Sequence, residues 1–312
     1  MLAYVVRRCL LTVPVLVGVA TLVFLLIHLV PGDPAEAMLG ESAAPTDLAA
    51  LRTRLGLDQP LAVQYKRFAT GLLHGQMGTS FRYNTPVTSE ILSRLGRTTE
   101  LALTAMAVAI LIALPLGVLG AVYRGRAPDQ IAMLVSLAGV AMPNFWLGPV
   151  LAIVFAIQLG WLPVSGTGTW QHLVLPSITL SVFQLALIMR LVRAEMLEVL
   201  RTDYIKFARA RGLSDRAVYF GHALKNTLVP VITITGLQLG QLIAFAIITE
   251  TVFQWPGMGL LFIQAVQFAD IPVMAAYLCL IALIFVLINL SVDLLYFAVD
   301  PRLRIERVAA AH

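Results

Sequence analysis

Hydrophobic residues in this sequence gather in runs of about 20 residues that alternate with polar segments. A helix rises about 1.5 Å per residue, so a run of about 20 residues crosses the roughly 30 Å of hydrocarbon in a bilayer. Backbone groups in lipid must find their hydrogen-bond partners within the segment, which favours helices over open strands. Six runs have this character: Cys9 to Val30, Thr99 to Tyr123, Ile131 to Leu159, Leu173 to Leu191, Val229 to Glu250 and Met274 to Val299.

The first run follows Arg7 and Arg8, as the apolar core of a secretory signal peptide would. It is longer than such a core, and the sequence after it is PGDPAEAM rather than a small-residue cleavage site. We therefore interpret it as a retained membrane anchor.

Composition supports the membrane assignment. The chain is 59% hydrophobic and 12% charged, with a mean hydropathy of +0.86, whereas a soluble domain has about 45–50% apolar and about 25% charged residues. The sequence thus predicts an all-α integral membrane protein with six transmembrane helices.

The basic residues predict the orientation. With the N-terminus in the cytoplasm, 15 of the 22 Lys and Arg residues fall on the inner side, and the other seven lie in the long loop from Pro31 to Thr98, which also holds six acids. Such a bias is typical of cytoplasmic loops, so both termini are predicted to be cytoplasmic. The net charge of +5 is thereby explained without nucleic acid.

Four segments follow from this topology: a first transmembrane helix with a cytoplasmic N-terminus (1–30), an extracytoplasmic helical loop (31–98), a five-helix core (99–299) with a cytoplasmic loop at 192–228, and a cytoplasmic tail (300–312). In the outer loop, Thr46 is a candidate N-cap for a helix to Leu55 that Gly56 stops, and a second helix is expected from Pro60 to about Leu73. This helical cap either packs around the first span or forms a docking surface.

Motifs for chemistry are absent from most of the chain. No G-x-x-x-x-G-K-[ST] phosphate-binding loop occurs, the five histidines are scattered without metal-ligand spacing, and VSGTG around Ser165 has no paired base at a readable spacing. Cys9 and Cys279 fall in different predicted spans and are interpreted as small core residues. We expect no catalytic, cofactor or metal site in this chain.

Polar residues inside the spans are the next candidates, because they are costly in lipid and are often functional. Gln238 and Gln241 stand three residues apart on one face of the fifth predicted helix, and Asn289 and Asp293 stand four apart on the sixth. Amides such as Gln238 and Gln241 either line a path for a polar solute or join helices. The remaining candidates are Glu100, Asn144, Gln158, Gln184 and Glu250.

The charged segment KFARARGLSDRAVYFGHALKNTLVPV (206–231) separates two hydrophobic runs and contains five basic residues and one acid. We expect a helix from about Asp203 to Arg211 that ends at Gly212, then a second short helix that Ser214 caps and that runs through Lys225, before Pro230. From the residues alone, this helical hairpin either rests on anionic headgroups or is a rigid surface for a soluble partner.

This segment resembles the cytoplasmic loop signature of ABC importer permeases, known as the EAA loop, in the A-x-A-x-G form of the peptide and nickel branch. Ala208, Ala210 and Gly212 occupy its small-residue positions and Pro230 its closing proline, while Ala208 stands where other branches have glutamate. The resemblance extends from about Met1 to Arg304. Other stretches similar to the first permease of dipeptide, oligopeptide, glutathione and nickel importers are the opening MLAYVVRRCLLTVPVLVGVATLVFLLIHLVPGDPA, LGLDQPL, GWLPVSGTGTWQHLVLPSITL, VFQWPGMGLLFIQAVQFADIPV and LINLSVDLLYFAVDPRLR.

The resemblance implies a type I ABC importer permease fold and a multi-pass protein of the bacterial inner membrane. It implies a second homologous permease, two ATPase subunits that bind ATP and Mg²⁺, an extracytoplasmic solute-binding protein, surrounding membrane lipid and a peptide solute, with a nickel or metal chelate as the alternative. The ATPase-coupling residues that it implies are Ala208, Arg209, Ala210, Arg211, Gly212, Leu213, Ser214, Asp215, Arg216 and Ala217.

Two other classes of function fit the sequence less well. A secondary transporter would show inverted repeats and ionisable residues near the membrane midplane, and an intramembrane enzyme would need a nucleophile with a base, or metal ligands, within its spans. Neither pattern is evident. Both alternatives also predict activity for this chain alone, whereas an importer permease requires its ATPase.

Overall fold

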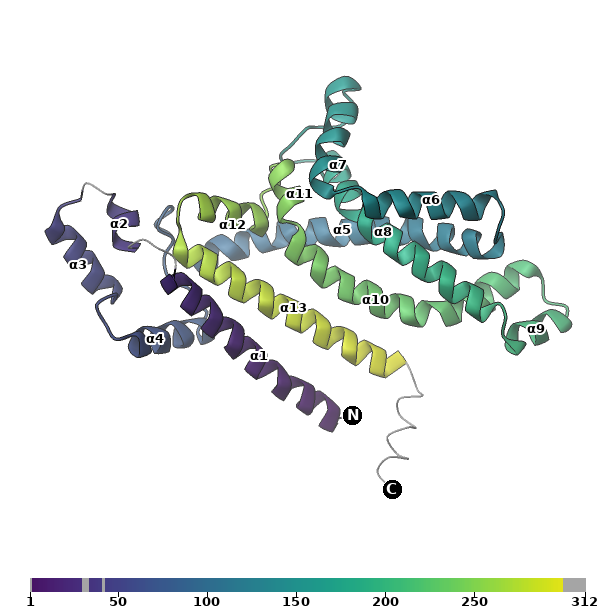
Figure 1. Cartoon of the computed structure of the whole chain (residues 1–312), viewed down its shortest axis with the longest axis horizontal. Helices are drawn as coiled ribbons and strands as arrows, with labels where there is room; N and C mark the ends of the chain where they lie inside the picture. The colour runs from purple at the N-terminus through teal and green to yellow at the C-terminus, as the bar shows by residue number, and fades with distance from the viewer. Residues whose placement is uncertain (1, 30–33, 41–42, 300–312) are drawn as a thin grey trace. The chain divides into compact units, whose positions relative to one another are not determined.

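The computed structural model describes residues 2–29, 34–40 and 43–299. The described parts of the chain are built from helices, and their only pairing of extended backbone is an isolated bridge between Thr79 and Pro86 (Figure 1). The predicted cytoplasmic tail, 300–312, lies outside the described residues. The chain divides into two compact units: Met1–Thr98 with Pro256–Val286, and Thr99–Trp255 with Leu287–His312.

Five of the helices are long and apolar enough to cross a membrane, and six are reached if one sharply bent pair counts as a span. This count, made over the described residues, confirms the predicted set of spans. Most helices extend past the hydrophobic runs that predict them. The span expected from Thr99, for example, belongs to a helix that begins at Val87, α5 (Val87–Val122).

The first unit contains the N-terminal helix and the outer helical cap. Its helices are α1 (Leu2–Leu29), α2 (Pro34–Leu39), α3 (Pro45–Leu55), α4 (Leu61–Leu73), α12 (Met258–Gln267) and the first parts of α5 and of α13 (Ile271–Val299). The expected end of α3 at Gly56 is confirmed by the left-handed φ of 73° at this residue. The expected N-cap at Thr46 is wrong: α3 begins at Pro45 after Ala44, because the fixed φ of proline suits the first turn of a helix.

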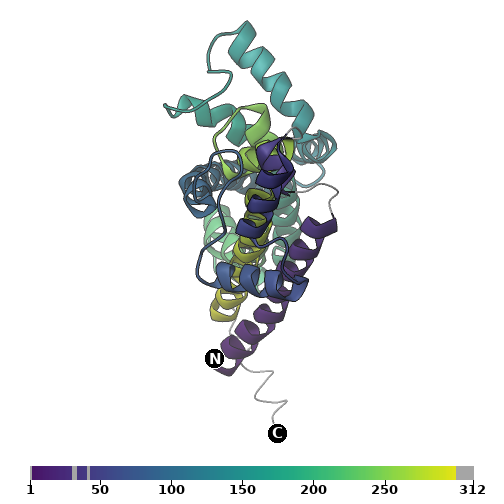
Figure 2. The same ribbon diagram turned by 90° about the vertical axis from the view of Figure 1, so that its left-hand side faces the viewer.

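Contacts with α1 give the outer cap a packing role. The hydroxyls of Thr21 and Tyr65 lie 2.7 Å apart, and the ring of Phe24 meets the rings of Tyr65 and Phe68 at centroid distances of 5.3 and 5.7 Å. These contacts hold α4 against α1 (Figure 2). Helix α3 instead contacts α2. Packing around the first span, one of the two interpretations of the outer loop, therefore describes α4 but not α3.

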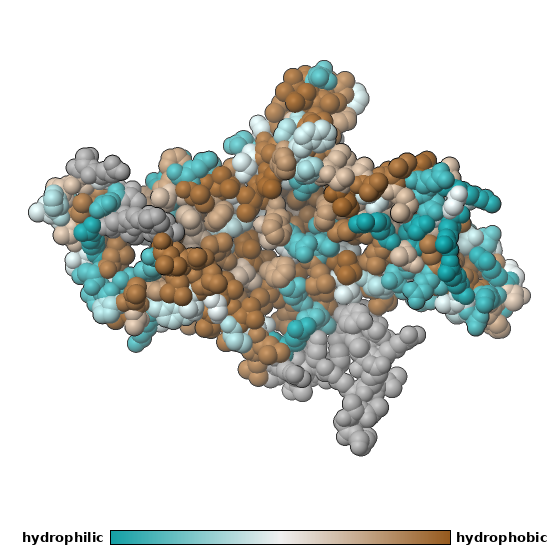
Figure 3. Space-filling model, viewed as in Figure 1, coloured by the Kyte–Doolittle hydropathy of each residue, from teal (hydrophilic) through white to brown (hydrophobic). Residues whose placement is uncertain are grey.

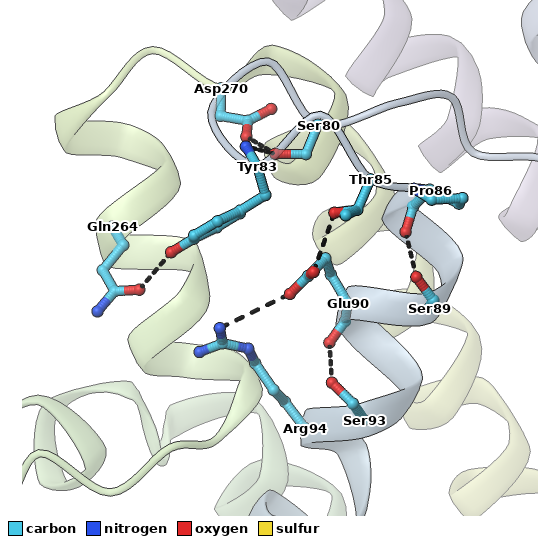
Figure 4. Close-up of polar contacts among 10 residues, drawn as sticks. All are labelled: Ser80, Tyr83, Thr85, Pro86, Ser89, Glu90, Ser93, Arg94, Gln264 and Asp270. Carbon is cyan, nitrogen blue, oxygen red and sulfur yellow. Dashed lines mark hydrogen bonds and ion pairs between the residues drawn. The ribbon is translucent and has the colours of Figure 1, made fainter.

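A second polar cluster of the first unit fixes the loop that precedes α5. Asp270 accepts hydrogen bonds from the Ser80 hydroxyl and from the backbone N–H groups of Phe81, at 3.1 Å, and Arg82, at 3.3 Å. The hydroxyl of Tyr83 donates to Gln264 on α12 at 3.2 Å (Figure 4). Because Asp270 is only 1% exposed, this carboxylate anchors the loop from inside the fold.

The second unit is organised around α8 (Gln171–Val199), which contacts α6, α7, α10 and α11. In its most apolar window, 61% of α8 is buried, so α8 is the central helix of this unit. The other elements of this unit are α6 (Ala127–Ala141), α7 (Asn144–Leu151), the π-helix η1 (Ala152–Gln158), α9 (Asp203–Ala210), the π-helix η2 (Ala217–Ala223), α10 (Leu224–Phe245) and α11 (Ile247–Val252), together with the remaining parts of α5 and α13.

The run predicted as one span from Ile131 to Leu159 is broken into two helical segments in the structure. The chain bends by 105° between α6 and α7 (Figures 1 and 2). The cause is Pro143: proline disfavours helical backbone at the residue before it, and Met142 accordingly adopts an extended conformation with ψ of 117°.

Candidate functional site

The predicted helix of the inner loop is present as α9, which covers Asp203–Ala210. One face is buried, with Ile205 at 0% and Ala208 at 5% exposure, and it packs against η2. On the outside, the Lys206 ammonium donates to the Asp203 carboxylate at 2.8 Å and lowers the pKa of this fully exposed acid. Ile205 and Ala208, three residues apart, form a short apolar stripe on α9. The helix is stable because η2 covers this stripe.

Gly212 ends this helix as predicted. Its φ is 78°, its N–H donates to the Arg209 carbonyl at 2.9 Å, and the Leu213 N–H donates to the Ala208 carbonyl at 3.4 Å. These two bonds form a Schellman motif, which requires a left-handed residue at this position. No atom lies within 4 Å of where a Cβ on Gly212 would be, so glycine is needed here for its backbone conformation and not for space.

Helical structure resumes after Ser214, whose hydroxyl accepts a hydrogen bond from the Ala217 N–H at 3.4 Å. The capping role expected of Ser214 is thus confirmed. The expected end of the second helix near Lys225 is wrong, because η2 continues directly into α10 and Pro230 lies inside that helix. Between Ser214 and Phe245 no described residue has a positive φ, so no residue there turns the chain out of the helix.

The inner loop is therefore shorter than the predicted boundaries, 192–228. Long helices occupy both ends of that range, and only residues 200–214 with α9 depart from them. We call this segment, with the η2 turn against which it packs, the α9 hairpin. It is a compact element joined without interruption to α8 and α10.

The outer surface of the α9 hairpin combines aromatic and cationic side chains. Exposures of 50% for Tyr204, 65% for Phe207 and 54% for Phe220 are high for aromatic residues. The guanidinium groups of Arg209 and Arg211 lie 6.0 Å from the Tyr219 ring and 5.9 Å from the Phe207 ring. Figure 3 shows hydrophilic surface over this end of the unit and hydrophobic surface over α6.

The structure divides the predicted coupling residues into two groups. Ala208 is buried against η2, so its small size serves packing within the hairpin and not contact with a partner. The next eight residues, from Arg209 to Arg216, are exposed, and Ala217 is half-buried. These exposed residues present a surface of mixed apolar and positive character to whatever covers it.

The two predicted path-lining amides have different surroundings. Gln241 is exposed and lines a cavity of about 260 Å³, whereas Gln238 is absent from its lining and leaves Oε1 without a hydrogen-bond partner. Two other polar candidates from the spans, Asn144 and Gln184, line the same cavity. Their convergence was hidden from sequence reasoning because they lie on different helices, 40 residues apart. The complete lining is Asn144, Leu180, Phe183, Gln184, Gln241, Leu242 and Phe245.

The remaining polar candidates do not join this group. Glu250 is fully buried and Gln158 is exposed, whereas Glu100 on α5 and Asn289 and Asp293 on α13 are half-buried. The cavity at α7, α8 and α10 is therefore the place where polar side chains of the predicted spans gather.

Known proteins resemble this chain over nearly all of its length. The family of N-terminal membrane components of binding-protein-dependent transport systems matches residues 1–102, and the family of inner membrane components of these systems matches residues 113–305. The dipeptide transport system permease protein DppB of Alkalihalophilus pseudofirmus is 43% identical over 332 residues, covering 97% of this chain and 100% of that protein. The glutathione transport system permease protein GsiC of Salmonella paratyphi A is 44% identical over 304 residues, with coverages of 97% and 99%.

Solved structures resemble the core of the fold. The MetNI methionine ABC transporter in an inward-facing conformation superposes with a TM-score of 0.58 at 20% identity, covering 68% of this chain and 96% of the matched one. This similarity confirms the predicted type I ABC importer permease fold. The two family matches and the relatives at 43% and 44% identity show that the chain belongs to the family of inner-membrane permease components of binding-protein-dependent ABC transport systems.

Proposed function

We propose that this chain is one of two permease subunits of an ATP-driven importer of peptides and that the α9 hairpin is the surface gripped by an ATPase subunit. The observation that supports the peptide solute most strongly is the similarity, at 43% and 44% identity and over 97% of this chain, to permeases for a dipeptide and for glutathione. Glutathione is itself a tripeptide, so both relatives carry solutes with peptide bonds.

The partners in this proposal are a second homologous permease, two ATPase subunits and an extracytoplasmic solute-binding protein. ATP and Mg²⁺ belong to the ATPase subunits, because this sequence contains no phosphate-binding loop of its own. The permease contributes half of the translocation path and the mechanical link to the ATPase. The chain is accordingly a transport subunit without catalysis of its own.

Three features of the α9 hairpin fit it for a mechanical role. Ile205 and Ala208 anchor its inner face, and the Schellman motif at Gly212 fixes its turn. Its second arm runs through η2 into α10 without a break. A displacement of α9 is therefore passed to a helix of membrane-spanning length and is not absorbed by a loose loop. Coupling between ATP hydrolysis and transport requires an element whose conformation responds both to the ATPase and to the translocation path, and the α9 hairpin with α10 can serve as this element.

The test of this role is Gly212→Val, with Gly96→Val on α5, outside the hairpin, as the matched control. Both glycines are exposed and have no atom within 4 Å of an added Cβ, but only Gly212 has a positive φ. A β-branched residue is a strained outlier there. We expect Gly212→Val to lower peptide uptake per ATP hydrolysed severalfold in liposomes containing the whole complex, while the control keeps the wild-type ratio.

Co-purification of the ATPase subunits is measured on the same samples. Loss of these subunits from Gly212→Val alone also supports the proposed grip. Equal uptake per ATP in both variants, with the complex intact, would contradict the coupling role of the hairpin. The solute is tested separately by uptake of a labelled dipeptide, glutathione and a nickel chelate. Transport of the nickel chelate alone would refute the peptide assignment.

A further inference from the structure

The cavity between α7, α8 and α10 lies at the break in the bent helix pair. Asn144 is the first residue of α7, directly after the 105° bend, while Gln184 stands in the middle of α8 and Gln241 near the end of α10. Its volume of about 260 Å³ is well above the roughly 30 Å³ that one water molecule occupies. A broken helix with polar groups beside it is a common setting for solute sites in membrane transporters.

Gln184 is the strongest sign that the cavity receives a ligand. The residue is 5% exposed, yet its Oε1 atom has no hydrogen-bond partner among the described residues. Buried polar groups are nearly always hydrogen-bonded, because leaving one without a partner costs free energy. The amide therefore has an unused acceptor beside the cavity for a group that enters it.

The chemistry of the lining identifies the kind of group that fits. Its polar members are all carboxamides, from Asn144, Gln184 and Gln241, and no ionisable side chain belongs to the lining. A carboxamide offers both a donor and an acceptor, as does the peptide group that would pair with it. The other lining residues are aliphatic or aromatic and suit a solute side chain.

The start of α7 adds a direction to this preference. Its N-cap residue, Pro143, makes no side-chain cap, and the N-terminal end of a helix carries the positive end of its dipole. An oxygen atom, such as a peptide carbonyl, is thereby favoured at the Asn144 side of the cavity.

We propose that this cavity is a contact site for the peptide backbone of the transported solute and that Gln184 and Gln241 hydrogen-bond one of its peptide groups during passage. The proposal rests on the peptide importer function proposed above and assigns residues and a recognised chemical group to it. Contact through backbone amides is independent of side-chain identity, so it suits a permease that passes peptides of varied sequence. The exposure of Gln241 and the 71% exposure of Phe245 leave the cavity open on the α10 side.

The first test compares Gln184→Leu and Gln241→Leu with the control Gln238→Leu. Gln238 lies on α10, three residues before Gln241, and also has an unpartnered Oε1, but it does not line the cavity. We expect each cavity variant to lower the maximal uptake of a dipeptide about three- to tenfold, the factor that one lost hydrogen bond gives, and the control to stay within about twofold. Uptake is measured in liposomes with the whole complex and saturating binding protein.

Assembly and stimulated ATPase activity separate a solute contact from a merely structural role. We expect both to be retained in the cavity variants. If Gln238→Leu lowers uptake as much as they do, or if they lose their partner subunits, the amides serve helix packing and the proposal is wrong.

The second test locates the solute directly. A dipeptide of alanine and photoleucine is irradiated during ATP-driven uptake, and its adducts are mapped by mass spectrometry. We expect adducts at Phe183 and Phe245, which line the cavity, and their loss in Gln184→Leu. Adducts confined to other segments of a transporting complex would overturn the cavity assignment alone. Failure of the wild-type complex to take up either a dipeptide or glutathione would overturn the peptide function with it.

Discussion

The ion pair between Arg193 and Asp129 provides the sharpest test of the packing of the second unit. Arg193, near the end of α8, donates from Nε to Oδ1 of Asp129 at 2.5 Å and from its terminal nitrogen to Oδ2 at 2.9 Å. The same carboxylate accepts the Gly125 N–H at 2.8 Å. A single acid thus ties the turn between α5 and α6 to the helix that leads into the α9 hairpin.

The geometry and burial of this ion pair set how much stability is lost when it is broken. Two unit charges about 4 Å apart attract by about 4 kcal/mol at an effective dielectric constant of about 20. Removing one partner of a buried pair costs about 3–5 kcal/mol, because the other charge is left without compensation. The side chains of Arg193 and Asp129 are 23% and 9% exposed, so water reaches the arginine, and we take about 2–3 kcal/mol for Arg193→Leu. For a unit of this size, that loss lowers the melting temperature by roughly 5–10 °C.

The assay is thermal melting of the detergent-solubilised complex with its partner subunits. Arg190→Leu, an exposed position on the same helix, is the matched control and should melt within about 1–2 °C of wild type, since surface substitutions usually stay within about 0.5 kcal/mol. The double variant Asp129→Leu with Arg193→Leu should regain most of the loss, because replacing both charges removes the uncompensated one. A melting temperature of Arg193→Leu equal to that of the control would refute this reasoning.

Two further predictions concern the close approach of helices and the outer loop. A Cβ on Gly117 would lie 2.8 Å from Cβ of Val192, so Gly117→Leu should lower the free energy of unfolding by about 2–3 kcal/mol through overpacking. The control Gly18→Leu, with no atom within 4 Å of the added Cβ, should melt like wild type. Equal melting temperatures of the two variants would contradict the contact between α5 and α8. Asp270→Ala should free the loop that this carboxylate anchors, because the lost hydrogen bonds cost about 3 kcal/mol. Amide exchange at Phe81 and Arg82, measured by hydrogen-exchange mass spectrometry, should become about 100-fold faster, and Asp270→Asn should be less affected. Unchanged exchange in the alanine variant would show that other contacts hold the loop.

Hydropathy was sufficient to predict most of the fold. The spans follow from runs of apolar residues because the membrane imposes both their length and their helical backbone. The turn of the α9 hairpin was equally readable: Gly212 after a short amphipathic helix and Ser214 before the next one are local signals that the structure confirms.

Features that depend on distant contacts were not readable from the sequence. The break at Met142 and Pro143 lies inside an unbroken apolar run, so hydropathy cannot separate a bent pair from one span. The continuation of the helix through Pro230 depends on the helical residues on both sides, which outweigh the hydrogen bond that proline removes. The cavity joins α7, α8 and α10, and no spacing along the chain places Asn144 and Gln184 together.

The importer function is tested most directly by ATP-driven uptake of a labelled dipeptide in liposomes, with this chain alone and with the partners that co-purify from its native membrane. We expect a second permease and ATPase subunits to accompany the tagged chain. Uptake should require all of them together with ATP and a binding protein, and the chain alone should be inactive. Uptake by the chain alone without ATP would contradict the importer function and would mark the chain as a secondary transporter.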